Sequence, residues 1–211
     1  MAFEELDDFE QERAVKEWLS NNWLTIAAGI ALGIGGLWGY GKWQLAQQEK
    51  SYTAANDFVQ MEQVLSLGEV AEADKMIAEY TEKFGNNIYA IKARMMAAGE
   101  LVKKDDMAAA KAQYKAVIDA KPDKAIAEMA RLRLARLLVA DGDFVNALAQ
   151  LNLVQSKAYQ TIVEEITGDV HLAQGELAKA KDAYQLALNE GEGYSGRQIV
   201  EMKLADVKAA E

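Results

Sequence analysis

The stretch from Gly168 to Leu188, GDVHLAQGELAKAKDAYQLAL, decides the fold of this chain. Gly175 separates two segments that favour helix, because glycine supplies the left-handed backbone that ends a helix. Small residues at Gly168 and Ala180 let the two helices approach closely, and Tyr184 is placed to fill the gap between successive pairs of helices. The spacing therefore predicts an antiparallel helical hairpin.

The same spacing resembles a tetratricopeptide repeat and recurs upstream. The earlier copies have small residues at the same two close-contact positions, namely Ala135 with Ala147 and Ala98 with Ala110. A poorer copy is expected in the helices Leu45–Leu67 and Glu69–Phe84, and Tyr194–Ala209 is predicted to be a final capping helix. The predicted fold class is all-α, with tetratricopeptide-like hairpins stacked into a solenoid.

Glycine, asparagine and aspartate mark the ends of the predicted helices, where they supply caps. Pro122 is the only proline, and no stretch sustains the two-residue alternation of a β-strand. The breaks are predicted at residues 67–68, 84–87, 104–106, 121–123, 141–143, 156–157, 174–176 and 190–193.

The segment Trp23–Tyr40, WLTIAAGIALGIGGLWGY, is apolar or glycine at every position except Thr25. As a helix it covers about 27 Å, close to the ~30 Å hydrocarbon thickness of a bilayer. Aromatic residues at both ends suit the two lipid–water interfaces. The sequence thus predicts an acidic tail over residues 1–22, a single transmembrane signal anchor over residues 23–43 and a soluble helical domain over residues 44–211.

Two other interpretations of this segment are a cleaved signal peptide and a buried core helix. The acidic tail lacks the basic region of a signal peptide, and the apolar stretch ends in large aromatic residues rather than a small-residue cleavage site. Lysine and arginine are balanced across the span, with Arg13 and Lys16 on one side and Lys42 and Lys50 on the other. Charge alone therefore does not predict which terminus is cytoplasmic.

Small residues recur every four positions along the span, at Ala27, Ala31, Gly35 and Gly39. Such a stripe lets a second transmembrane helix approach closely, although glycine is also common in membrane helices that have no partner. The stripe is our predicted transmembrane helix interface.

The composition argues against several classes of function. The net charge of −10 repels phosphate backbones, so nucleic-acid binding is not expected. Without cysteine there is no disulfide, no thiolate metal site and no cysteine nucleophile. The one histidine, His171, is expected to pack inside its hairpin. The sequence predicts no cofactor, no metal site, no catalytic residue and hence no enzyme.

A groove for a partner or client is expected on the concave face, which the first helix of each hairpin lines in tetratricopeptide arrays. Carrying the inward positions of those helices onto this chain selects Lys92, Met95, Met129, Leu132, Arg136, Val139, Ile162, Glu165, Asp169 and Leu172. Flexible methionines ringed by charges suit varied unfolded segments. The alternative is that Met129, Leu132 and Val139 are packed under the C-terminal capping helix.

Arg131, Arg133 and Arg136 form the densest basic cluster of the chain. They are either surface charges that find carboxylates within the domain or contacts for an acidic segment of a partner.

Several motifs together resemble the YfgM family of ancillary subunits of the bacterial SecYEG translocon. They are AVKEWL at Ala14–Leu19 with Asn22, the glycine-rich span, ARLRLARLLVADGD at Ala130–Asp143, and GDVHLAQG at Gly168–Gly175. The resemblance covers essentially the whole chain. One departure is Trp23, where such proteins tend to have glycine.

The resemblance implies a single-pass protein of the bacterial inner membrane, with its N-terminus cytoplasmic and its C-terminal domain periplasmic. It also implies a place beside SecYEG, where the domain hands emerging chains to periplasmic chaperones in company with the membrane-anchored chaperone PpiD. The alternative function is a scaffold in envelope assembly or stress signalling, which would bind a regulator through the same groove.

Overall fold

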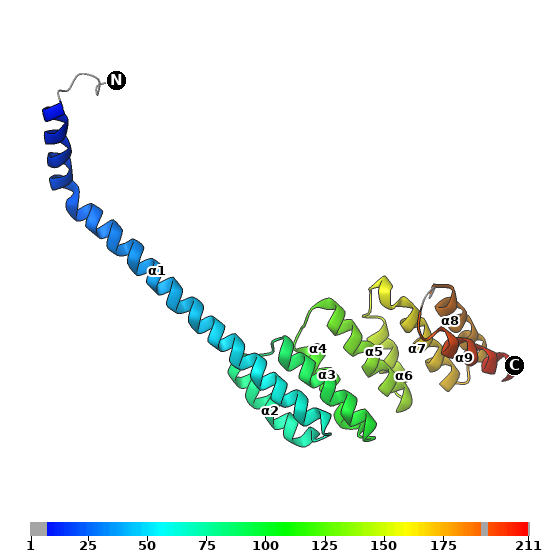
Figure 1. The fold of residues 1–211 in the computed structure, drawn as a ribbon. Helices are drawn as coiled ribbons and strands as arrows, with labels where there is room; N and C mark the ends of the chain where they lie inside the picture. The colour runs from blue at the N-terminus through cyan, green and yellow to red at the C-terminus, as the bar shows by residue number, and fades with distance from the viewer. Residues whose placement is uncertain (1–7, 191–193, 211) are drawn as a thin grey trace. The chain divides into compact units, whose positions relative to one another are not determined.

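The computed structural model describes residues 8–190 and 194–210, in which every regular element is helical (Figure 1). These residues form α1 (Asp8–Ser66), α2 (Val70–Phe84), α3 (Ile88–Lys103), α4 (Met107–Asp119), α5 (Lys124–Ala140), α6 (Phe144–Leu151), the 3-10 turn η1 (Lys157–Tyr159), α7 (Gln160–Ala173), α8 (Leu177–Glu190) and α9 (Arg197–Ala210). The predicted all-α class is confirmed. The chain divides into two compact units after Thr53.

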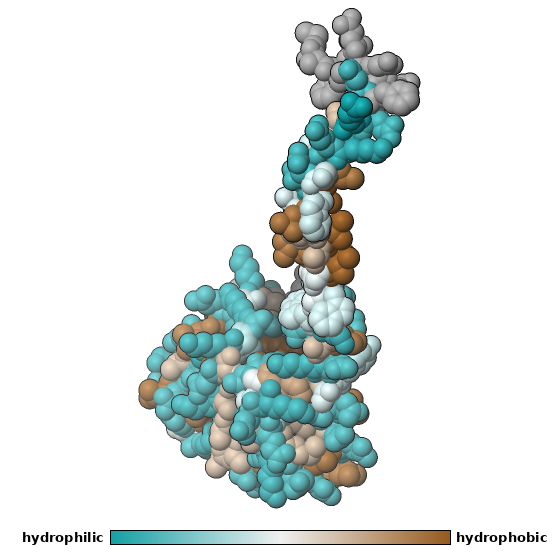
Figure 2. Space-filling model, turned by 90° about the vertical axis from the view of Figure 1, so that its left-hand side faces the viewer, coloured by the Kyte–Doolittle hydropathy of each residue, from teal (hydrophilic) through white to brown (hydrophobic). Residues whose placement is uncertain are grey.

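Helix α1 contains the predicted span. Its large apolar side chains there, such as Leu24, Leu32 and Leu37, are exposed, so the alternative of a buried core helix is wrong. Figure 2 shows a hydrophobic band along this helix next to a hydrophilic stretch. The helix expected to start near Leu45 has no beginning of its own, because neither glycine nor proline lies between Gly41 and Leu67 and α1 continues unbroken to Ser66.

The second unit is a row of helical hairpins (Figure 1). The last turns of α1 share a hydrophobic core with α2 and α3. Helix α3 packs against α4, α5 against α6, and α7 against α8, while α9 packs against α8 at the end of the row. Successive hairpins are joined by contacts of α2 with α3, α4 with α5, and α5 with α7. This order is that of the predicted solenoid.

The turns form where the sequence predicted them. Gly142 and Gly175 have φ of 76° and 75°, the left-handed backbone that glycine adopts without strain. Asp105 takes the corresponding place between α3 and α4 with φ of 63°. Side chains of Asp106, Asp123 and Asp143 then accept hydrogen bonds from backbone N–H groups in the first turn of the next helix. The break predicted at 190–193 lies partly outside the described residues.

The repeat register is confirmed by burial. The residues at the two close-contact positions are all buried: Ala98, Ala110, Ala135, Ala147, Gly168 and Ala180. Tyr184 is fully buried and packs on Gly168 of its own hairpin as well as in a cluster with Val200 and Leu204 of α9. The aromatic residue therefore fills space inside its hairpin and toward the capping helix.

Candidate partner-binding surface

All ten residues predicted to line a groove lie on α3, α5 and α7, the first helices of three consecutive hairpins. The structure places them in three different environments. Three line an open groove, three belong to the hydrophobic core, and three take part in a polar network around the buried Glu165. Leu172, near the end of α7, is 38% exposed and belongs to none of these.

The open groove lies between α3 and α5 and has a volume of about 500 Å³. It contains three of the predicted residues, Lys92, Met95 and Met129. The full lining is Ile88, Ile91, Lys92, Met95, Met96, Gly99, Glu100, Lys103, Ile126, Met129 and Arg133. Among the described residues, none from the capping helix α9 lines this groove, so α9 does not cover it.

Three predicted residues belong to the core instead. Leu132 is only 5% exposed and clusters with Leu151 of α6 and Ile166 of α7. Val139 and Ile162 are half-buried against the same cluster. These side chains hold α5, α6 and α7 together, and Leu132 in particular is not accessible to a partner.

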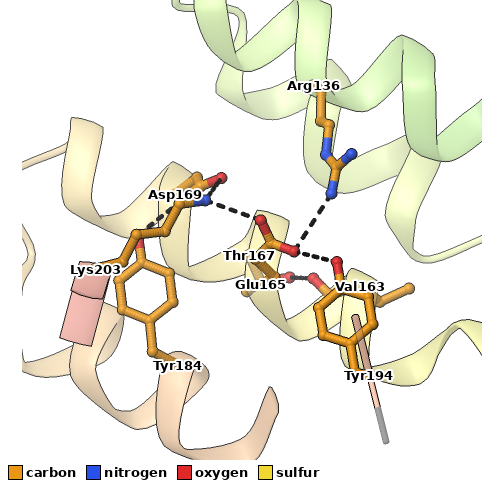
Figure 3. Close-up of polar contacts among 8 residues, drawn as sticks. All are labelled: Arg136, Val163, Glu165, Thr167, Asp169, Tyr184, Tyr194 and Lys203. Atoms are coloured by element: carbon orange, nitrogen blue, oxygen red, sulfur yellow. Dashed lines mark hydrogen bonds and ion pairs between the residues drawn. The ribbon is translucent and has the colours of Figure 1, made fainter. Parts of the chain in front are cut away.

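Glu165 and Asp169, one turn apart on α7, form a polar network with α5, α8 and α9 (Figure 3). The Glu165 carboxylate, 5% exposed, accepts hydrogen bonds from Tyr194 Oη at 2.8 Å and Lys203 Nζ at 2.9 Å. Arg136 Nη2 lies 3.3 Å from the same carboxylate. The network links the capping helix α9 to α7.

Lys203 of α9 is the centre of this contact. Its ammonium group also lies 2.8 Å from the carboxylate of Asp169, which in turn accepts a hydrogen bond of 2.7 Å from Tyr184 Oη. The one lysine thus bridges two carboxylates of α7 (Figure 3). Burial, together with the hydrogen bond to Asp169 and the nearby carboxylate charges, raises the pKa of Tyr184, so its hydroxyl stays protonated and remains a donor.

Burial acts to raise the pKa of Glu165, because it disfavours the charged form. The hydrogen bonds from Lys203 and Tyr194 and the charges of Lys203 and Arg136 outweigh it and lower the pKa below its ordinary value of 4.5. Since the folded pKa is depressed, ionised Glu165 stabilises the fold above about pH 4.5, and this contribution is lost as the pH falls through the folded pKa.

Glu165→Gln should therefore lower the free energy of unfolding at pH 7 by about 1–3 kcal/mol, because a charge-assisted network loses its anion. The difference from the wild type should shrink as the pH falls below 4.5, where the wild-type carboxyl becomes neutral as well. Melting curves of the full chain between pH 3 and pH 7 measure this. Glu201→Gln, which removes an exposed ion pair on α9, is the control and should follow the wild type. Parallel stability curves for Glu165→Gln and the wild type would contradict the assignment.

The predicted stripe Ala27, Ala31, Gly35 and Gly39 is exposed along α1. A Cβ atom added at Gly35 or Gly39 would meet nothing within 4 Å. No described residue of the chain therefore covers Gly35 or Gly39, and contact of the stripe with a second helix stays a prediction.

Sequence reasoning missed two groups of functional interest. Met96 and Ile126 complete the floor of the groove, but nothing in their spacing sets them apart from core residues. Lys203 and Tyr194 lie far from Glu165 in the sequence, and no motif pairs them. The one sequence feature that pointed to these groups is the arginine cluster. Arg131 donates a hydrogen bond to Gln150 and Arg136 donates one to Glu165, whereas Arg133 lines the groove. His171, half-buried, contacts Glu176 across the hairpin turn at 2.7 Å.

Comparisons with known proteins agree with this architecture. The family model described as a tetratricopeptide repeat-like domain matches residues 16–209. Three curated relatives are each named ancillary SecYEG translocon subunit. The one from Haemophilus influenzae is 26% identical over 94% of this chain and 97% of its own length.

The relative from Aggregatibacter actinomycetemcomitans is also 26% identical, over 94% of this chain and 97% of its own length. The relative from Escherichia coli is 25% identical, over 92% of this chain and 94% of its own length. No solved structure gives a significant match. The chain belongs to the tetratricopeptide repeat-like domain family, and its resemblance to the YfgM family is confirmed.

Proposed function

We propose that this protein is a non-enzymatic ancillary subunit of the SecYEG translocon, anchored in the bacterial inner membrane by residues 23–43. The observation that supports this most directly is the near full-length similarity to three proteins that carry that name. An array of helical hairpins that presents an open groove suits a scaffold, since such arrays bind partners along their concave side.

We further propose that the tail, residues 1–22, is cytoplasmic and that residues 44–211 form a periplasmic domain. There the domain would help transfer translocated proteins to periplasmic chaperones, with a PpiD-like membrane-anchored chaperone as its partner. The methionines of the groove support contact with unfolded client segments, because their flexible side chains adapt to varied apolar surfaces.

Protease added to spheroplasts should degrade the helical domain while a tag on the tail stays protected. The reason is that the bilayer shields the tail on the cytoplasmic side. Immunoblots against the tag and against the domain measure both ends. A protected domain would reverse the orientation and remove any periplasmic role.

Purification of the tagged full chain in mild detergent should bring SecYEG subunits with it. If the small-residue stripe mediates the contact, Gly35→Leu with Gly39→Leu should still insert into the membrane but lose these subunits, because leucine blocks close approach of helices. Gly29→Leu with Gly33→Leu is the matched control, since these two glycines lie roughly 120° around the helix from Gly35 and Gly39.

Absence of SecYEG from the wild-type purification would overturn the proposed function and favour a scaffold in envelope assembly or stress signalling. Loss in the control variant equal to that in Gly35→Leu with Gly39→Leu would show that the stripe is not the contact face.

A further inference from the structure

We propose that the groove between α3 and α5 binds an amphipathic helix whose apolar stripe is flanked by carboxylates. The inference rests on the proposed function in one respect, because it describes a partner or client of the same scaffold. Neither the fold nor the names of the relatives indicate that the occupant is an amphipathic helix with flanking carboxylates.

The floor of the groove is apolar and adaptable. Six of its lining residues are isoleucine or methionine, and Met129, at its middle on α5, is 38% exposed. Ile88, at the beginning of α3, is 53% exposed. Since these side chains neighbour one another along two helices, they present a continuous apolar strip. Such strips on soluble domains mark sites where another apolar surface docks.

The rim is positive, although the protein carries a net charge of −10. Lys92, Lys103 and Arg133 surround the groove, against the single carboxylate of Glu100. Glu100 is paired with Lys103 at 2.6 Å, and Lys92 lies 4.0 Å from Glu62. Among the described residues, Arg133 makes no hydrogen bond or ion pair. The rim therefore has spare positive charge, which favours carboxylates on the occupant.

The lining also selects a helix over an extended segment. Its polar side chains are the four charged ones just named, and the backbones of α3 and α5 are hydrogen-bonded within their own helices. An extended occupant would leave its N–H and C=O groups without partners in the apolar part of the groove. A helix satisfies its backbone internally and offers an apolar stripe at positions i, i+3, i+4 and i+7.

The chain itself does not supply this occupant. Its acidic tail, which has apolar residues at Phe3, Leu6 and Phe9, is separated from the domain by the span. The capping helix α9 is engaged with α8 and with Glu165 and Asp169 of α7. The occupant is consequently another polypeptide.

The test uses the full chain in nanodiscs of zwitterionic lipid. The probe is a fluorescein-labelled synthetic peptide of about 16 residues, long enough to follow α3 at ~1.5 Å per residue. It carries leucine and methionine on one helical face and glutamate on both flanks. Fluorescence anisotropy, with empty nanodiscs as background, should show saturable binding. A peptide with lysine in place of glutamate, and one whose helix is broken by two central prolines, should bind at least about tenfold more weakly.

Variants of the groove complete the test. Arg133→Glu and Met129→Ser should each weaken binding of the glutamate peptide about fivefold or more, with unchanged melting temperature. The matched controls are Lys208→Glu and Met202→Ser, which change an exposed cation and an exposed methionine on α9. They should bind like the wild type.

Each other result overturns the inference. Equal binding of the proline peptide would mean an extended occupant, and equal binding of the lysine peptide would remove the role of the rim. An equal loss in Lys208→Glu would show only attraction by overall charge, and no binding at all would leave the groove without this ligand. None of these results bears on copurification with SecYEG, so the failure of the two proposals can be told apart.

Discussion

Replacing Leu132 by serine should lower the free energy of unfolding by about 3–5 kcal/mol. The change removes a branched side chain from a core shared by α5, α6 and α7, and it places a hydroxyl at a position that is only 5% exposed. Urea-induced loss of helical circular dichroism, measured on the full chain in detergent, gives the value. A loss of less than about 1 kcal/mol, which is typical of substitutions at the surface, would contradict the burial of Leu132.

The matched variant is Met129→Ser, three residues earlier on the same helix. Its side chain is 38% exposed in the groove, so its removal should change stability by less than about 1 kcal/mol. The contrast between the two variants separates core from groove. If Met129→Ser keeps its stability, weaker peptide binding by this variant reflects the altered groove surface and not a loss of folding.

Gly168→Ala should destabilise the domain by about 1–3 kcal/mol, although alanine favours helix over glycine by ~1 kcal/mol. A Cβ atom at this position would overlap the ring of Tyr184. The ring cannot move aside, because it is fully buried and its hydroxyl donates to Asp169. Gly99→Ala in α3 is the control: its Cβ would meet nothing within 4 Å, so the same substitution should be neutral or stabilising there.

A double-mutant cycle identifies the cause of the effect. With Tyr184→Ala as the starting protein, Gly168→Ala should no longer destabilise, because the ring that it would strike is absent. Urea unfolding of all four proteins supplies the coupling free energy. Additive losses would show that glycine is needed at this position for a reason other than Tyr184.

The fold could be predicted from the sequence because its determinants are local. Small residues such as Ala135 and Ala147 recur at a fixed spacing, and Asp105, Gly142 or Gly175 takes the left-handed backbone at the turn within a hairpin. Both signals act within one hairpin, so they do not depend on how hairpins stack.

The accessible face of α5 could not be predicted in the same way. Around the helix, Leu132 lies about 60° from Met129 in one direction and Arg133 about 40° in the other. Which of these neighbours becomes buried depends on the angle at which α7 packs against α5, and that angle arises from contacts between repeats. The repeat pattern therefore predicted the helix that carries the groove but not the limits of the groove.

The bridge that Lys203 makes from α9 to Glu165 and Asp169 also limits how the array can evolve. Solenoids commonly lengthen when one repeat is duplicated, since each repeat contacts only its neighbours. Here a hairpin inserted between α8 and α9 would carry Lys203 away, and Arg136 would be the one cation left at the buried Glu165 among the described residues. A buried carboxylate that loses its partner is strongly destabilising. The ionic contact of the last helix thus disfavours lengthening of the array between α8 and α9.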